Sequence, residues 1–107
     1  MTRNDEDLAA QVRQALRAVI DPELGYNVVD LGFVYDVSVE EGVAHITMTV
    51  TSRGCPAASY LKEGVTNSAL LVSGIGSADV TVTFDPPWQP RMIAPEVKAL
   101  LGFAEVN

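Results

Sequence analysis

The chain has 107 residues, 48% of them hydrophobic, and carries a net charge of −7. This length fits one domain, residues 1–107, with a hydrophobic core of its own. An acidic surface repels phosphate groups, which argues against nucleic acid and anionic membranes as partners. One cysteine cannot form an internal disulfide. The N-terminus is too polar for a signal peptide and no apolar run is long enough to span a bilayer, so a cytoplasmic protein is expected.

The first predicted element is a helix over residues 5–20, because apolar side chains recur there with the helical period. Asp21 precedes Pro22, and a residue before proline is disfavoured in the α region. We therefore expect the helix to end at this point and a loop to follow over residues 21–32.

Two strands joined by a tight turn are expected after the loop. In residues 33–39, Phe33, Tyr35, Val37 and Val39 alternate with Val34, Asp36 and Ser38. Gly42 can adopt the positive φ of a hairpin turn. In residues 43–51, one face holds Ala44, Ile46, Met48 and Val50, and the wetter face holds His45, Thr47, Thr49 and Thr51. This alternation predicts a sheet with one buried face.

The second half of the chain continues with a helix from Pro56 to about residue 72, a strand over residues 78–84, a stiff DPPWQP loop and a short helix over residues 95–101. Because one helix connects the second and third strands, these strands should be parallel. The order helix, strand, strand, helix, strand, helix predicts an α/β (α+β) two-layer sandwich with a three-stranded mixed sheet.

The stretch TSRGCP places Cys55 at or near the start of the second helix, directly after the second strand. Free backbone N–H groups and the helix dipole favour a thiolate there, so its pKa should lie below the usual value of about 8.5. A thiolate binds metals and attacks electrophiles, and the hydroxyl of Thr51 could hydrogen-bond to the sulfur or to a ligand. The alternative is that Cys55 is a small buried hydrophobic side chain.

Several motifs should converge on one end of the sheet, because the hairpin strands are antiparallel and the second and third strands are parallel. This end would gather the side chains of Asp21, Glu23, Asp30, Cys55, Asp85 and Trp88. A thiol beside carboxylates is a donor set for zinc or iron. The carboxylates could instead cap turns, and Trp88 could cover one end of the core.

One cysteine per chain is short of the four thiolates usual for an iron–sulfur cluster. Two chains could share a cluster as a homodimer, or small thiols could complete the shell, and such an incomplete shell suits a carrier that releases its cargo. Catalysis is not expected. His45 lies remote from Cys55, so no Cys–His pair forms, and the nucleotide-binding motifs are missing from the sequence.

The ordered set DPELGYNVVDLGFVYDV, TVTSRGCP and DPPW resembles the SufT-like metal–sulfur cluster assembly factors. These are bacterial relatives of a eukaryotic cytosolic iron–sulfur assembly component, and PaaD-like proteins share their domain. The resemblance covers about the whole chain and implies an iron–sulfur cluster assembly domain-like fold. It implies that Cys55 and Thr51 are the motif cysteine and threonine. The acidic motif positions would be Asp21, Glu23, Asp30 and Asp85.

The resemblance also implies a part in maturing iron–sulfur proteins, with assembly proteins and client apoproteins as partners. In this interpretation the protein is a non-enzymatic accessory or carrier factor. Cys55 holds iron or a cluster transiently, Asp30 and Asp85 orient the thiol, and Trp88 shapes a docking rim. Two other functions stay open, a metal-free adaptor between assembly proteins and clients, and a PaaD-like accessory factor for a ring-hydroxylating oxygenase.

Overall fold

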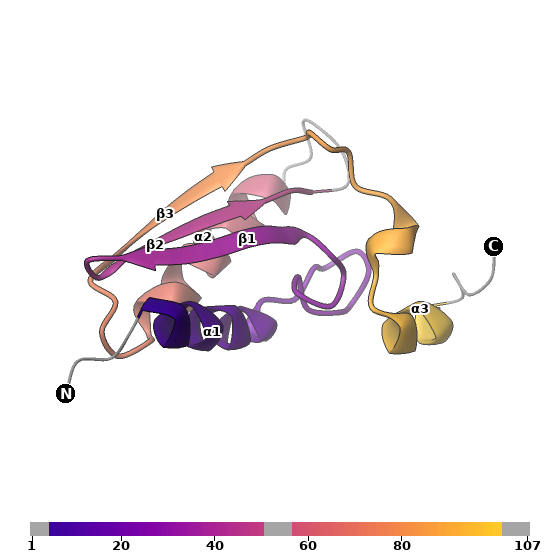
Figure 1. Ribbon diagram of the computed structural model, residues 1–107. Helices are drawn as coiled ribbons and strands as arrows, with labels where there is room; N and C mark the ends of the chain where they lie inside the picture. The colour runs from indigo at the N-terminus through magenta and orange to yellow at the C-terminus, as the bar shows by residue number, and fades with distance from the viewer. Residues whose placement is uncertain (1–4, 51–56, 102–107) are drawn as a thin grey trace.

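The computed structural model describes residues 5–50 and 57–101 (Figure 1). Its elements occur in the predicted order: α1 (Asp5–Ala15), η1 (Leu16–Ala18), β1 (Val34–Glu40), β2 (Val43–Met48), α2 (Ala57–Leu70), β3 (Ser77–Val82), η2 (Pro90–Met92) and α3 (Pro95–Leu101). They form two layers, with α1 and α2 on one face of a three-stranded mixed sheet. The predicted fold class is confirmed.

The sheet has the order β1-β2-β3. The antiparallel pair β1–β2 closes through a two-residue turn in which Glu41 and Gly42 have φ angles of 52° and 79°, and Glu40 pairs with Val43. The β2–β3 pair is parallel and α2 connects its strands, as predicted. The start of β1 and the ends of β2 and β3 therefore lie at the same end of the sheet, opposite the hairpin turn.

The hydrophobic core lies between the sheet and the two long helices. Every second side chain of β2 points into it and is buried, namely Ala44, Ile46 and Met48. The helices complete it with a stripe from each: Leu8, Val12 and Leu16 from α1 and η1, and Leu61, Val65 and Ala69 from α2. Burying each large aliphatic side chain contributes about 1.5–3 kcal/mol, so this layer stabilises the end of the sheet where the motifs meet.

The first helix ends earlier than the predicted residue 20. After Ala15 the chain tightens into η1 and then becomes extended at Val19, whose φ and ψ angles are −92° and 116°. Ile20 forms an isolated antiparallel bridge with Asn27. The pairing of Ile20 with Asn27 therefore ends the helical segment. It does so before Asp21, the residue that Pro22 disfavours in the α region.

The predicted clean alternation of the first strand is wrong at its start. The register of β1 against β2 shifts between Val34 and Asp36, which inserts one extra residue as a β-bulge. Next to this bulge, the consecutive residues Phe33 and Val34 are both buried. The bulge lies at the end of the sheet where the candidate site was expected.

The second strand ends at Met48, before the predicted residue 51. Thr49 was expected on the wetter face but is fully buried. Its polar atoms are satisfied, since its N–H donates to the Phe33 carbonyl at 2.7 Å and its hydroxyl to the Val50 carbonyl at 3.3 Å. The 3₁₀ helix η2 follows the DPPW motif, where only a loop was predicted. No helix in the part of the chain that the structure describes is long and apolar enough to cross a membrane.

Candidate functional site

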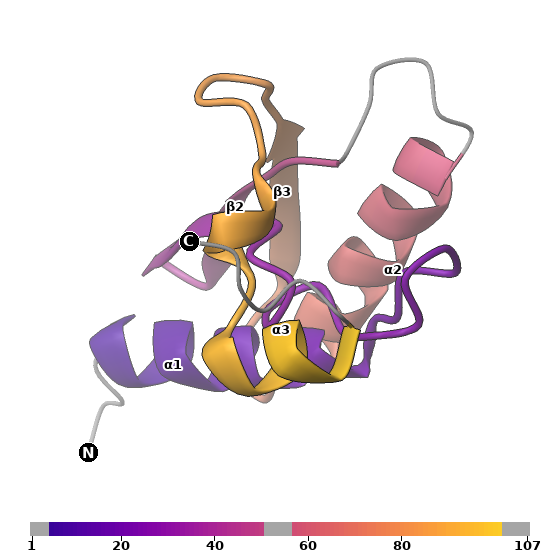
Figure 2. The ribbon, with the colours of Figure 1, turned by 90° about the vertical axis from the view of Figure 1, so that its right-hand side faces the viewer.

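The candidate site lies at the end of the sheet opposite the hairpin turn, where three chain segments meet (Figure 2). The N–H of Thr49, just after β2, donates to the carbonyl of Phe33 at 2.7 Å. The N–H of Thr83, just after β3, donates to the carbonyl of Met48 at 2.8 Å. The end of β2 therefore lies between the start of β1 and the end of β3, which confirms this part of the predicted convergence.

The carboxylate of Asp30 is held by side chains from two directions. Arg17 forms a bidentate pair with it, with both N–O distances at 2.9 Å, and the Asn27 amide donates to it at 3.1 Å. Asn27 also accepts the N–H of Asp30 at 2.8 Å. With its side chain only 19% exposed, Asp30 joins η1 to the VVDLG loop. Its present partners make it a structural link.

Asp21 closes the turn that carries Glu23. One carboxylate oxygen of Asp21 accepts the N–H groups of Glu23 and Leu24 at 3.1 and 2.8 Å, and Asp21 is only 4% exposed. Its backbone N–H donates to the carbonyl of Tyr26 and its carbonyl accepts the N–H of Gly25. Asp21 thus shapes the DPEL turn, while Glu23 remains exposed on it.

The DPPW motif is clamped against the start of β1. The Trp88 indole N–H donates to the Leu31 carbonyl at 2.7 Å, and its ring meets Phe33 edge-on with centroids 5.4 Å apart. The Tyr35 hydroxyl donates to the Pro86 carbonyl at 2.7 Å. The half-buried Trp88 therefore covers one end of the core, as the alternative interpretation held, and its polar atom is already used.

The segment after DPPW also packs on this end. The Ala94 N–H donates to the backbone carbonyl of Asp30 at 2.7 Å. Gly32 has a φ of +78°, and a Cβ there would clash with the Met92 carbonyl, so only glycine fits without a shift. Asp85, by contrast, is exposed and its N–H donates to the Thr83 hydroxyl at 3.2 Å.

Cys55 and Thr51 lie outside the described residues, in the segment 51–56 that connects β2 to α2. The structure therefore leaves their predicted roles untested. Within the residues it does describe, no group of three or more histidine, cysteine, aspartate or glutamate side chains could hold a metal ion. Of the four predicted acidic positions, Asp21 and Asp30 are engaged, and Glu23 and Asp85 are exposed.

His45 lies on the uncovered face of the sheet, half-buried, with Nδ1 3.7 Å from an Asp79 oxygen, as expected for a surface histidine. Sequence reasoning missed Arg17 and Tyr35, which hold two of the motifs. Arg17 is 13 positions from Asp30, a separation that carries no local signal. The three-residue separation of Asn27 and Asp30 is a turn pattern and could have been recognised.

Comparison with known proteins supports the motif assignment. The profile of a family described as "Iron-sulfur cluster assembly protein" matches residues 9–84. The chain is 38% identical over 99 residues to the Fe-S protein maturation auxiliary factor YitW of Bacillus subtilis, covering 92% of this chain and 97% of the relative. It is 40% identical over 85 residues to the Fe-S protein maturation auxiliary factor SufT of Staphylococcus aureus, covering 78% of this chain and 97% of the relative.

The fold agrees with a solved relative as well. A crystal structure of a domain of unknown function, DUF59, from Bacillus anthracis superposes with a TM-score of 0.85 at 40% identity, over 92% of this chain and 94% of that one. The order of helices and strands and the mixed sheet are thus those of a known fold. The chain belongs to the iron–sulfur cluster assembly protein family, as its SufT-like motifs predicted.

Proposed function

We propose that the protein is a non-enzymatic accessory factor in iron–sulfur cluster assembly that carries iron or a cluster on Cys55 and passes it to client apoproteins in the cytoplasm. The observation that supports this most is that the start of β1 and the ends of β2 and β3 meet at one end of the sheet, through the hydrogen bonds at Phe33, Met48 and Thr83. Residues 51–56, which hold Cys55 and Thr51, follow in the sequence directly after the end of β2 at this frame.

The carboxylates of the site favour transient binding of the cargo. Asp30 already accepts from Arg17 and Asn27, and Asp21 accepts two backbone N–H groups. Either group would have to break existing bonds to become a ligand. Cys55 with an exposed carboxylate of Glu23 or Asp85 gives fewer donors than a closed shell needs, so the remaining ligands would come from a second chain, a small thiol or the client.

Anaerobic reconstitution with ferrous iron and sulfide tests this function. The wild-type protein should retain iron and show sulfide-to-iron charge-transfer absorption, whereas Cys55→Ser should retain neither, because a serine hydroxyl is rarely ionised near neutral pH and is a harder ligand. Size-exclusion chromatography of the reconstituted protein shows whether two chains share the cluster. Equal iron content in both proteins would exclude Cys55 as a ligand.

Stability is the control for this substitution. Since the Arg17–Asp30 pair, the Trp88–Leu31 bond and the Tyr35–Pro86 bond hold the frame without the segment 51–56, Cys55→Ser should leave the midpoint of thermal unfolding unchanged. If Cys55→Ser lost both iron and stability, the loss of iron could not be assigned to the loss of a ligand. Cys55→Ala would then separate the contribution of a helix cap from that of metal binding.

A metal-free adaptor is the second candidate, favoured by an open groove beside α2 whose polar side chains have no hydrogen-bond partner in the part of the chain that the structure describes. An adaptor should mature clients normally with Cys55→Ser. Trp88→Ala is a poor test of docking, because Trp88 packs on Phe33 and removing the ring would cost about 3 kcal/mol of stability. Trp88→Phe keeps an aromatic ring against Phe33 while removing the indole N–H and part of the exposed ring surface, so it is the better variant for a client-maturation assay.

A further inference from the structure

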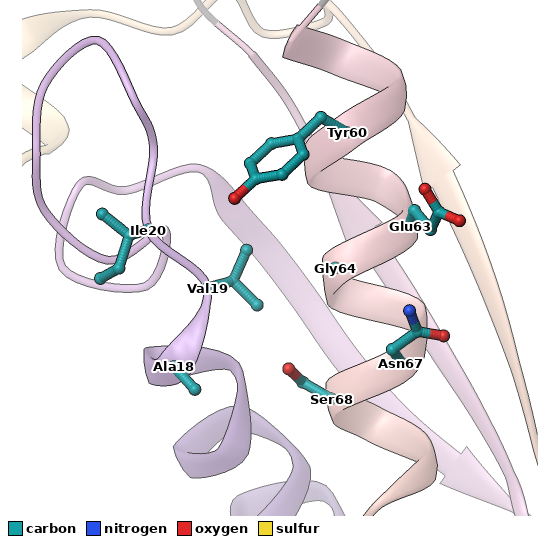
Figure 3. A pocket seen from close by; sticks show the side chains of 8 residues that line it. All are labelled: Ala18, Val19, Ile20, Tyr60, Glu63, Gly64, Asn67 and Ser68. Carbon is teal, nitrogen blue, oxygen red and sulfur yellow. The ribbon is translucent and has the colours of Figure 1, made fainter.

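A groove of about 350 Å³ separates α2 from the extended segment that follows η1 (Figure 3). Its two walls are in close contact at Gly64 and Val19, where a Cβ on Gly64 would lie 3.2 Å from a Val19 methyl group. The DPEL turn begins at Asp21, directly after this segment, so the groove adjoins the candidate site. The missing side chain of Gly64, which costs a helix about 1 kcal/mol, keeps the two walls close.

The first wall is formed by Ala18, the last residue of η1, and by Val19 and Ile20, where the chain is extended. The bridge to Asn27 uses one edge of this extended segment and leaves the opposite edge of Ile20 unpaired among the described residues. Within residues 5–50 and 57–101, no hydrogen bond reaches the N–H or the carbonyl of Ile20.

The second wall is one side of α2. The ring of Tyr60 and the hydroxyl of Ser68 reach towards the extended segment, and Glu63 and Asn67 lie on the adjoining flank (Figure 3). None of these four side chains forms a hydrogen bond with the rest of the described chain. Tyr60 is 60% exposed and Ile20 is 44% exposed, so both walls of the groove present apolar surface to solvent.

We propose that this groove binds an extended peptide segment of a partner protein as an added β-strand on the edge at Ile20. A peptide strand is the occupant that offers an N–H and a carbonyl at the spacing of the free N–H and carbonyl of Ile20. From Tyr60 to Ser68 the helix rises about 12 Å, which matches three to four residues of extended chain at roughly 3.3 Å each.

The negative charge of the groove and of the whole chain indicates which kind of peptide segment would bind. Glu63 is the charged residue in the lining, and the whole chain carries 14 acidic against 7 basic residues. A segment that alternates small apolar side chains with lysine or arginine would place its apolar side chains towards the floor at Gly64 and its cations on the outer face, where the carboxylate of Glu63 on the flank of α2 attracts them over a longer distance. The proposal rests on the proposed function, because the partner would be an assembly protein or a client.

Titration of the full-length, ¹⁵N-labelled protein with a capped eight-residue peptide of alternating valine and lysine tests the proposal. We expect amide shifts at Ile20 and along α2 from Tyr60 to Ser68, and slower hydrogen exchange of the Ile20 N–H. The same peptide methylated on alternate backbone nitrogens should bind about tenfold more weakly, because it loses the N–H groups that pair with the edge.

Two charge variants refine the test. Glu63→Lys should weaken binding about fivefold, whereas Glu40→Lys makes the same charge change on the uncovered face of the sheet and should leave it unchanged. Equal binding of the methylated peptide, an unshifted Ile20 amide at millimolar peptide, or shifts centred on Asp36 and Asp79 would each overturn the proposal. Because no readout contains iron, failure here leaves the reconstitution result intact, and failed reconstitution leaves peptide binding intact.

Discussion

The ion pair between Arg17 and Asp30 makes a sharp prediction about what the motif carboxylate does. In the structure Asp30 is a link between η1 and the VVDLG loop, held by two N–O contacts of 2.9 Å. If Asp30 acts on the site only by holding this loop in place, then removing the Arg17 guanidinium must affect the protein in the same way as removing the charge of Asp30. We therefore expect Arg17→Met and Asp30→Asn to behave alike, in stability and in iron retention.

The stability lost when this ion pair is removed can be estimated from the exposure of its two side chains. Exposed ion pairs contribute about 0.2–1 kcal/mol and hydrogen bonds to charged groups about 1.5–3 kcal/mol. The Arg17 side chain is 42% exposed and that of Asp30 is 19% exposed, so the pair falls between these limits, at about 1.5 kcal/mol. For a domain of this length that lowers the midpoint of thermal unfolding by roughly 6–10 °C. The double variant should cost little more than either single one, which gives a coupling energy of about 1 kcal/mol.

Urea unfolding of the four proteins, followed by reconstitution with iron and sulfide, measures both quantities. Arg13→Met removes the same kind of side chain one turn earlier, on α1, where Arg13 forms no ion pair with any described residue, and should change stability by less than about 0.5 kcal/mol. The positioning role is refuted if Asp30→Asn abolishes iron retention while Arg17→Met retains it at full level. That outcome would make Asp30 itself a ligand.

Three further predictions concern the frame and the thiol. Gly32→Ala should cost about 3 kcal/mol in urea unfolding, whereas Gly25→Ala, at nearly the same φ but in open space, should cost about 1 kcal/mol. Tyr35→Phe should lose about 1 kcal/mol by removing a hydrogen bond, and Tyr60→Phe almost nothing; equal losses would contradict this. The rate of Cys55 alkylation by iodoacetamide should rise with pH through a midpoint below about 8.5, and a higher midpoint would argue for a buried, inert thiol.

Periodicity predicted most of the fold because each element here has one buried side. The stripe on α1 and the alternation in β2 each leave a single choice of face, so element type and order follow. The bulge could not be predicted, since Phe33, Val34 and Tyr35 are all apolar or aromatic and fit either register. The early end of α1 was missed for a related reason. It depends on the bridge between Ile20 and Asn27, which forms only when the loop folds back.

The location of the site could be predicted because it depends on the directions of the strands. The side-chain contacts within the site could not, because they depend on residues far apart in the sequence. Antiparallel and parallel pairing alone bring the ends of the strands together, and the hydrogen bonds at Phe33 and Met48 confirm this. The partner of Asp30 could not be read from the sequence, because Arg17 faces it only after η1 packs beside the loop. The hydrogen bond from the Trp88 indole N–H to the Leu31 carbonyl also had no sequence signal, and the part of Trp88 in a docking rim stays a prediction.

These contacts separate the frame of the site from its chemistry. The VVDLG loop is fixed to η1 by Arg17, to the DPPW motif by Trp88 and to the C-terminal segment by the N–H of Ala94. All three attachments lie in segments other than 51–56, so the frame can form before any cargo is bound. A carboxylate held this firmly orients its surroundings well and is poorly suited to exchange ligands. If the protein hands a cluster to another protein as proposed, the carboxylates free to exchange as ligands are the exposed ones, Glu23 and Asp85.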